Sequence, residues 1–401
     1  MPNPSFLEAA WKGFHVAATE ELSDSHLLLI LEPEHSLAPL CSRCGQPCGL
    51  IHERTVRRVR DRDLLDKRVT LEVPLRRVDC LRCGRVVEAL EWLSPHRRLT
   101  RRLEAWVEAL AQLLPTQHVC TLTGLHWHTV KALDKRRLEA QHGAFDATGV
   151  RRLVMDEFAL HKGHRYATVV MDADTLRVLW VGEGNSRAAI RPFFETLGPQ
   201  CKAIEAVAMD MNTAFDLEVR KHCPQAEVVY DLFHVVARFG REVIDRVRVD
   251  QANALRQDKP ARQVVKRSRW LLLRNRDNLT DEQAIQLDEL LAANQPLASV
   301  YLLKTLLKEI WYAPSIWEGF RRWREWYRFC KESGIKAAVE FAKRLRNYLR
   351  GILASARYRL HTSCLEGVNN KIKVIKRMAY GFRDTEYFFL KIKAAFPGKV
   401  R

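Results

Sequence analysis

The sequence predicts a multidomain α/β protein whose front module is rich in strands and stapled by cysteines. Three observations support this fold class. Two identical Cys-x-x-Cys-Gly motifs occur at residues 41–45 and 80–84. Strand-like and helix-like segments alternate between residues 146 and 240, which is typical of a mixed sheet. Residues 241–355 carry helical periodicity almost throughout and few strand signals.

Composition narrows the class of protein further. The chain has 401 residues, of which 47% are hydrophobic, so a globally disordered chain is excluded. Lys and Arg number 66 against 48 Asp and Glu, which gives a formal charge of +18. A chain this basic most often has a polyanionic partner, and nucleic acid is the leading candidate. The sequence has no apolar run of membrane-spanning length and no secretory pattern, so we expect no membrane partner and a cytoplasmic location.

Residues 1–98 are predicted to form a zinc ribbon that holds one structural Zn²⁺. A pair of thiolates in each tight turn can reach one tetrahedral ion, and the following glycine allows the backbone to fold beneath it. The intervening stretch alternates β-branched residues with arginine and favours antiparallel strands. Unrelated structural thiols are the weaker alternative, and Cys48 is a spare thiol without a matching partner. The expected zinc ligands are Cys41, Cys44, Cys80 and Cys83.

Arginines are dense in this first module. They could form a solvated face, but so many on a small unit favour phosphate contact. The set comprises Arg43, Arg57, Arg58, Arg60, Arg76, Arg77 and Arg82.

Residues 99–145 are predicted to form a helix-turn-helix domain. The first helix ends at Pro115, a short helix and a turn at Gly124 follow, and the next helix begins near His126. A plain helical linker is the alternative. The start of the last helix is the expected DNA-reading position, and it carries His126, Trp127, His128 and Lys131.

Carboxylates mark the expected ends of three strands between residues 146 and 240. They are Asp156, Asp210 and Asp231, and strand ends at the rim of a sheet are a usual place for a site. Metal-dependent phosphodiester cleavage needs several carboxylates around two divalent ions. A helical Glu366 could complete a triad with the first two aspartates.

The C-terminal half is helical and basic. Its Trp-dense segment 311–327 fits a helical core better than base stacking at a DNA end, although both interpretations remain open. In residues 356–401, apolar residues recur on one helix face. The other face is mostly polar, and we expect DNA contacts from its basic residues Lys373, Lys376 and Arg377.

These motifs together resemble the ISL3 family of bacterial insertion-sequence transposases, which are DDE enzymes. The resemblance covers nearly the full length, and its C-terminal block is the most specific part. It rests on the two cysteine knuckles and on the blocks Leu125–Val130, Met155–Thr168, Ala208–Asn212, Asp231–His234, Leu365–Lys373 and Arg377–Arg383.

The resemblance implies an RNase H-like catalytic fold. Its metal-binding triad would be Asp156, Asp210 and Glu366, which hold two Mg²⁺ or Mn²⁺ ions. Asp231 and His234 also match a family motif, and we expect them beside the metal ligands or at phosphates.

The resemblance also implies a divided catalytic core. Residues 146–240 would form its first part and residues 356–401 its second part. Residues 241–355 would then be an all-helical insertion between them.

The same resemblance implies what the protein does. An active transposase binds terminal inverted repeats, nicks DNA at the element end and joins it to target DNA, as a homodimer on paired ends at the bacterial nucleoid. The alternative is a non-catalytic, sequence-specific DNA-binding regulator derived from a transposase, and the intact triad argues against it. A nuclease without strand transfer fits the DNA-binding front half poorly.

Overall fold

The computed structural model describes residues 10–161, 165–360 and 363–399, with the side chains of residues 363–366 also outside the description. The chain divides into two compact units, Met1–Ala140 and Gln141–Arg401, which are described separately. None of the described helices is long and apolar enough to cross a membrane.

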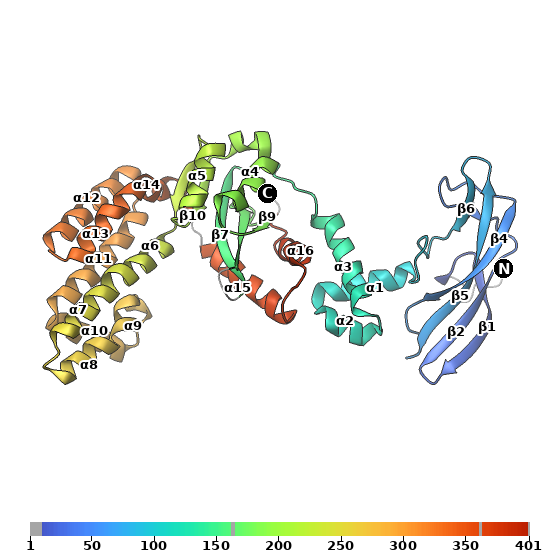
Figure 1. Ribbon diagram of the computed structural model, residues 1–401, viewed down its shortest axis with the longest axis horizontal. Helices are drawn as coiled ribbons and strands as arrows, with labels where there is room; N and C mark the ends of the chain where they lie inside the picture. The colour runs from blue at the N-terminus through green and yellow to red at the C-terminus, as the bar shows by residue number, and fades with distance from the viewer. Residues whose placement is uncertain (1–9, 162–164, 361–362, 400–401) are drawn as a thin grey trace. The chain divides into compact units, whose positions relative to one another are not determined.

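The first unit begins with a six-stranded sheet (Figure 1). Its strands lie in the order β1-β2-β5-β6-β3, and β4 pairs with β5. The bounds are β1 Phe14–Ser23, β2 His26–Pro33, β3 Leu40–Cys41, β4 Ile51–Arg60, β5 Arg68–Cys80 and β6 Gly84–Ala89.

This sheet is larger than the expected zinc ribbon. Trp11, Phe14 and Trp92 are buried together with aliphatic residues of β2, β4 and β5. The cysteines form a separate buried cluster at the other end of β5. The module therefore has an apolar core of its own, which does not depend on the cysteine cluster.

Three helices follow the sheet in the same unit. They are α1 Arg101–Leu113, α2 Thr116–Thr123 and α3 Trp127–His142. Gly124 ends α2 in the left-handed conformation, with φ of 67°, as the predicted turn requires. Asp61, fully buried at the end of β4, accepts hydrogen bonds from Trp11, Thr100 and Arg102. That carboxylate ties the sheet to the start of α1.

The second unit contains a five-stranded mixed sheet in the order β11-β10-β7-β8-β9 (Figure 1). The first three strands in sequence are antiparallel, and β10 and β11 run parallel to β7. Their bounds are β7 Arg152–His161, β8 Arg165–Asp172, β9 Val178–Glu183, β10 Ala206–Met209 and β11 Glu227–Tyr230.

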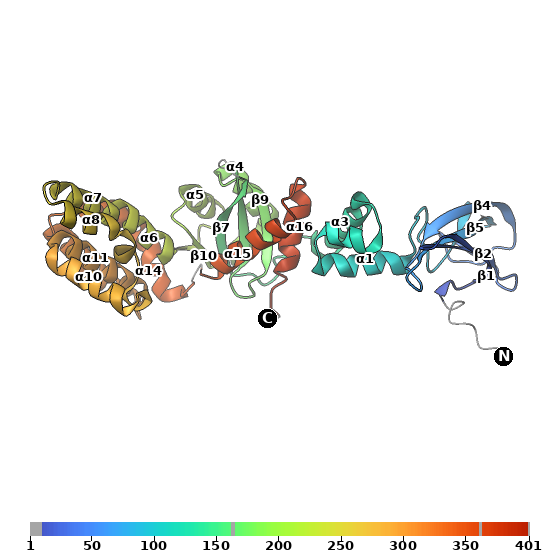
Figure 2. The same ribbon diagram turned by 90° about the horizontal axis from the view of Figure 1, so that it is seen from below.

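Helices cover both faces of this sheet. One face packs on α4 Arg187–Leu197 and α5 Thr213–His222 and on helices of the following segment. The other face packs on α15 Ser363–Met378 and α16 Thr385–Ala395. Figures 1 and 2 show α15 lying against the strands on that second face. A 3-10 turn at Gly198–Ala203 follows α4.

The remaining segment is helical, as predicted. Its helix α6 continues through a π-helical turn, Gly240–Ile244, into α7. Short 3-10 turns cover Arg276–Asn278 and Arg346–Tyr348. The helices are α6 Leu232–Phe239, α7 Asp245–Ala254, α8 Lys259–Arg267, α9 Arg269–Leu273, α10 Asp281–Ala293, α11 Gln295–Trp311, α12 Ile316–Glu332, α13 Lys336–Leu345 and α14 Leu349–Tyr358.

The Trp-dense segment divides between core and surface. Trp311, Trp323 and Trp326 are buried in the helical core, as the favoured interpretation predicts. Trp317 instead leaves 74% of its surface exposed. The indole nitrogen of Trp311 donates a hydrogen bond of 3.0 Å to the carbonyl oxygen of Tyr230, the last residue of β11. The helical segment is thereby fastened to the sheet.

Candidate active site and metal site

Three aspartates lie in one row across neighbouring strands of the five-stranded sheet. Ala208 of β10 pairs with Val154 of β7 in parallel register, so two residues further along Asp210 lies beside Asp156. The parallel pairing of β11 with β10 continues the row and brings Asp231 beside Asp210. Adjacent strands are about 4.8 Å apart, so the three carboxylates converge on one small volume.

The expectation that Asp156 ends its strand is wrong. β7 continues to His161 because the antiparallel neighbour β8 pairs with it along most of its length, whereas the pairing with β10 stops at Val154. Asp210 and Asp231 do follow their strands directly. The row thus lies where β7 loses one neighbour but keeps the other.

Helix α15 contributes a residue that contacts the row of aspartates. The side-chain amide nitrogen of Asn369 donates a 2.7 Å hydrogen bond to a carboxylate oxygen of Asp156. Glu366, the expected third acid, lies one helical turn before Asn369 in the same helix, but its side chain is outside the described residues. Asn369 was not among the predicted site residues, although it belongs to the C-terminal block.

Burial, and to a smaller extent nearby carboxylates, raise the pKa values of two acids in the row. Burial raises the pKa of Asp210 to about 6, and the carboxylates of Glu157 and Asp156 add to the rise. Burial also raises the pKa of Asp156, while the Glu157 backbone amide and the nearby His234 oppose the rise. Both carboxylates therefore lack enough positive charge nearby to offset their desolvation.

Two buried oxygen atoms of the site have no hydrogen-bond partner among the described residues. They are one carboxylate oxygen of Asp210 and the amide oxygen of Asn369. Carboxylate and amide oxygens are ligands of hard divalent cations, and a cation would also relieve the desolvation of Asp156 and Asp210. The donor set therefore fits Mg²⁺ or Mn²⁺.

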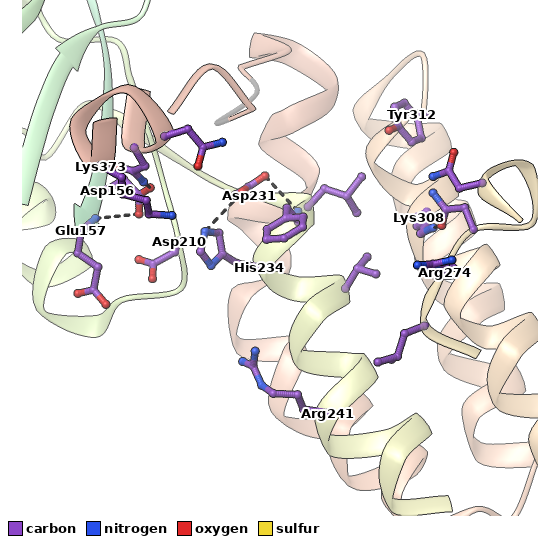
Figure 3. Close-up of a pocket in the computed structure, with 18 residues that line it drawn as sticks. Asp156, Glu157, Asp210, Asp231, His234, Arg241, Arg274, Lys308, Tyr312 and Lys373 are labelled. Carbon is purple, nitrogen blue, oxygen red and sulfur yellow. Dashed lines mark hydrogen bonds and ion pairs between the residues drawn. The ribbon is translucent and has the colours of Figure 1, made fainter. Parts of the chain in front are cut away.

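Asp231 differs from Asp210 because both of its carboxylate oxygens have partners. One oxygen accepts a hydrogen bond of 3.1 Å from the backbone of Phe233 and caps α6. The other lies 3.8 Å from the Nε2 atom of His234. Figure 3 shows the His234 ring between Asp231 and Asp210. Asp231 and His234 are thus in contact with each other and border the site.

The row opens into a cavity of about 1130 Å³. Its sheet-side wall is acidic and includes Glu157, which follows Asp156 directly in the sequence. Figure 3 shows a second wall on the far side, formed by the helical segment. No local pattern in the sequence indicates that wall, because its residues come from segments that are far apart in the chain; they include Arg241, Arg274, Lys308 and Tyr312.

The basic residues expected to contact DNA from α15 do not all face the cavity. Lys373 lines it, close to the acid row. The ammonium group of Lys376 instead donates to the backbone carbonyl of Leu160. The guanidinium of Arg377 is exposed and lies along its own helix. The helix therefore presents its basic residues to different surroundings.

The start of α3 is exposed, as a DNA-reading helix requires. His126, Trp127 and His128 lie on the surface, whereas Val130 and Leu133 are buried against the other helices. The ammonium nitrogen of Lys131 lies 5.6 Å from the centre of the Trp127 ring. A connected aromatic and basic surface results.

The four predicted zinc ligands come together. The sulfur atoms of Cys41, Cys44, Cys80 and Cys83 all lie within 4.8 Å of one another. Tetrahedral Zn²⁺ with bonds of about 2.3 Å needs sulfur atoms roughly 3.8 Å apart. Cys48 is buried in the same cluster but donates to the carbonyl of Gln46. The donor set and its spacing fit one zinc ion.

Hydrogen bonds shape the thiol chemistry at this cluster. The backbone amide of Arg82 helps to lower the pKa of Cys80 to about 6, and hydrogen bonding with Cys44 raises the pKa of Cys83 to about 12. A cation would allow all the thiols to ionise together. Nearby, the expected phosphate contact from Arg76 is wrong, because its guanidinium is buried in an ion pair with Glu88.

Comparison with known proteins gives matches over both units. Residues 153–392 match the transposase model of the ISL3 DDE group, and residues 88–138 match the helix-turn-helix domain of transposase family ISL3. The helix-turn-helix prediction is thereby confirmed.

Two curated relatives extend over most of the chain. The transposase for insertion sequence element IS1001 of Bordetella parapertussis is 54% identical over 395 residues, which cover 98% of this chain and 97% of that protein. The transposase for insertion sequence element IS1557 of Mycobacterium tuberculosis is 29% identical and covers 89% of this chain and 85% of that protein. With a family match over more than half its length and a relative this similar from end to end, the chain belongs to the ISL3 family of transposases.

Proposed function

We propose that the protein is the DNA transposase of a bacterial insertion sequence. It binds the terminal inverted repeats of its element, cleaves DNA strands at the element ends and joins the freed 3′-hydroxyl groups to target DNA. The observation that carries this proposal is the aligned, half-buried pair Asp156 and Asp210 at the cavity, where one oxygen of Asp210 has no hydrogen-bond partner among the described residues.

The strand order supports an RNase H-like catalytic core. Three antiparallel strands are followed by two parallel strands on the other side of β7, and the acids lie at the point where the pairing changes direction. Sites in open α/β sheets form where strand connections diverge. In this proposal, α15 contributes the third acid, Glu366.

Asp156, Asp210 and Glu366 would hold two Mg²⁺ or Mn²⁺ ions. Such ions polarise the scissile phosphate, activate the attacking oxygen and stabilise the leaving 3′-oxygen. Asn369 fixes the orientation of the Asp156 carboxylate through its 2.7 Å hydrogen bond. Asp231 and His234 border the site, where they orient neighbouring groups or contact a phosphate.

Cleavage and joining use one type of bond exchange. Water first attacks the phosphorus at the element end, and the bond to the 3′-oxygen breaks, which leaves a 3′-hydroxyl. That hydroxyl then attacks a target phosphodiester, a new bond to phosphorus forms and a target 3′-oxygen leaves. The same acids serve both steps, because in each step negative charge develops at a phosphate of the same geometry.

The first unit supplies recognition in this proposal. The start of α3 enters the major groove, and a Zn²⁺ ion held by Cys41, Cys44, Cys80 and Cys83 fixes one end of the sheet. Processing two element ends together favours a homodimer, and the substrate places the protein at the nucleoid.

A nicking assay tests the proposal. The full chain, a duplex that carries the element end and Mg²⁺ should yield a nick at that end, and the Asp156→Asn chain should yield almost none. Equal nicking by both proteins, or none by the native chain on its own end in Mg²⁺ and Mn²⁺, would refute it.

A further inference from the structure

The far wall of the cavity is basic and aromatic. It carries the guanidinium groups of Arg241 and Arg274, the ammonium group of Lys308 and the phenol ring of Tyr312. Figure 3 shows Arg274, Lys308 and Tyr312 across the cavity from Asp156 and Asp210, and Arg241 further along the helix that carries His234. A charged cavity with acids on one wall and cations on the other is suited to a polyanion that the acids bind only through metal ions.

Helix α11 holds Lys308 and the loop that carries Arg274 in place. Lys304, buried in that helix, donates hydrogen bonds of 2.7 Å to the carbonyl oxygens of Leu272 and Arg274. Lys308, one turn later, donates to the side-chain oxygen of Asn275. The loop after α9 is therefore fixed against α11, and it presents the Arg274 guanidinium to the cavity.

These cations are also available for an anion. Nearby arginines are ion-paired, Arg238 with Glu242 and Arg276 with Asp288. Within the described part of the chain, Arg241 and Arg274 form no ion pair with a carboxylate. The guanidinium of Arg274 donates only a long hydrogen bond of 3.5 Å to the side-chain oxygen of Gln283, so phosphates can neutralise both charges without breaking an ion pair.

Tyr312 is exposed but not loosely placed. The residue leaves 67% of its surface exposed although it lines the cavity. The preceding residue, Trp311, is buried and bonded to the carbonyl of Tyr230, and Tyr230 directly precedes Asp231. One hydrogen bond thus fixes the distance between the Tyr312 backbone and the acid row.

We propose that this wall binds an unpaired stretch of a DNA strand next to the cleavage point. Arg241, Arg274 and Lys308 contact its phosphates, and the ring of Tyr312 stacks on a base. Cations combined with exposed aromatic rings are the usual features of single-strand binding, and a ring can reach a base face only where that base is unpaired or terminal. The inference deepens the proposed function, on which its placement beside a cleavage point rests.

Binding without cleavage tests the wall separately from the reaction. The full chain is titrated, without divalent metal, into a fluorescein-labelled thymidine oligonucleotide and into a blunt duplex of unrelated sequence, with anisotropy as the readout. Tyr312→Ala should weaken binding of the single strand about fivefold to a hundredfold. Tyr312→Phe keeps the ring and should bind within about twofold of the native chain.

Two further variants sharpen the test. Trp317→Ala removes an equally exposed ring outside the cavity lining and should leave single-strand affinity unchanged. The double variant Arg241→Gln with Arg274→Gln should reduce the salt dependence of single-strand binding by roughly 0.7 in the log–log slope for each lost phosphate contact.

The outcomes separate this inference from the proposed function. The proposed strand-binding role of the wall is refuted if Tyr312→Ala binds the single strand with native affinity. It is also refuted if Tyr312→Ala and Trp317→Ala lose the same single-strand affinity, even if the native chain nicks its end DNA. Equal loss of duplex and single-strand affinity also overturns it. A selective loss in Tyr312→Ala supports the wall even if the native chain fails to nick its end DNA, in which case only the proposed reaction is refuted.

Discussion

Replacing Asp210 by asparagine should make the metal-free protein more stable. Burial raises the pKa of this carboxyl from 3.8 to about 6, so the folded state resists its ionisation. Above pH 6 the shift of about 2 units corresponds to about 3 kcal/mol of unfolding free energy, which Asp210→Asn should recover. For an acid with a raised folded pKa, the native chain loses stability as the pH rises from about 4 to 6. The gain in Asp210→Asn should therefore vanish below pH 4.

Hydrogen exchange of peptides from β7 and β10 measures this gain, because their slowest amides report the unfolding of the second unit. Asp250→Asn is the matched control, since that carboxylate is 55% exposed and its removal should change stability by less than about 0.5 kcal/mol. Mg²⁺ at ten times its dissociation constant should stabilise the native chain by about 1.4 kcal/mol and Asp210→Asn much less. A destabilised Asp210→Asn chain at pH 7, or a gain that persists at pH 4, would refute the reasoning.

Three further predictions concern other parts of the chain. Cys41→Ser should abolish zinc binding, which metal analysis measures. Hydrogen exchange should show that the apolar core around Trp11 is still protected in this variant. Bound zinc near one ion per chain in Cys41→Ser would contradict the prediction. Deleting residues 1–140 should abolish the preference for the element ends and leave weak, salt-sensitive DNA binding. If competition assays show that the preference is retained, the second unit must recognise the element ends. Glu218→Gln should lower stability by about 2 kcal/mol at pH 7, because hydrogen bonds from Arg191 and Arg187 lower the pKa of the buried Glu218 to about 2. Because the folded pKa of this acid is lowered, the difference in stability between native and variant chains should shrink as the pH falls from 4.5 toward 2. Urea unfolding that shows the same difference at both pH values would contradict this prediction.

Local patterns were enough to predict most of the elements. The strands and helices between residues 150 and 240 follow the periodicity of their apolar residues, and caps such as Ser186 and Asn212 mark helix starts. The two cysteine knuckles predicted their own convergence, because each turn needs only local geometry. The strand pattern of the segment alone does not predict the position of Asp156 within β7, because pairing with β8 sets the length of that strand.

The far wall of the cavity could not be predicted in the same way. Arg241, Arg274 and Tyr312 come from segments that are far apart in the sequence, and only tertiary packing brings them together. Asn369 had a weak signal, since it follows Glu366 by one helical turn and therefore shares its face. Its bond to Asp156 joins residues that are 213 positions apart, a contact that periodicity does not report.

The identity of the third acid is the central claim that one measurement tests most directly. Nicking of an end-bearing duplex in Mg²⁺ or Mn²⁺ is compared for Asp156→Asn, Asp210→Asn, Asp231→Asn and Glu366→Gln. We expect the first two and Glu366→Gln to lose several orders of magnitude in rate while DNA binding persists, because each removes a metal ligand. Asp231→Asn should lose roughly tenfold to a hundredfold, because it supports the ligands instead of binding the ions. Near-native cleavage by Glu366→Gln together with no cleavage by Asp231→Asn would contradict the account and assign the third metal ligand to Asp231.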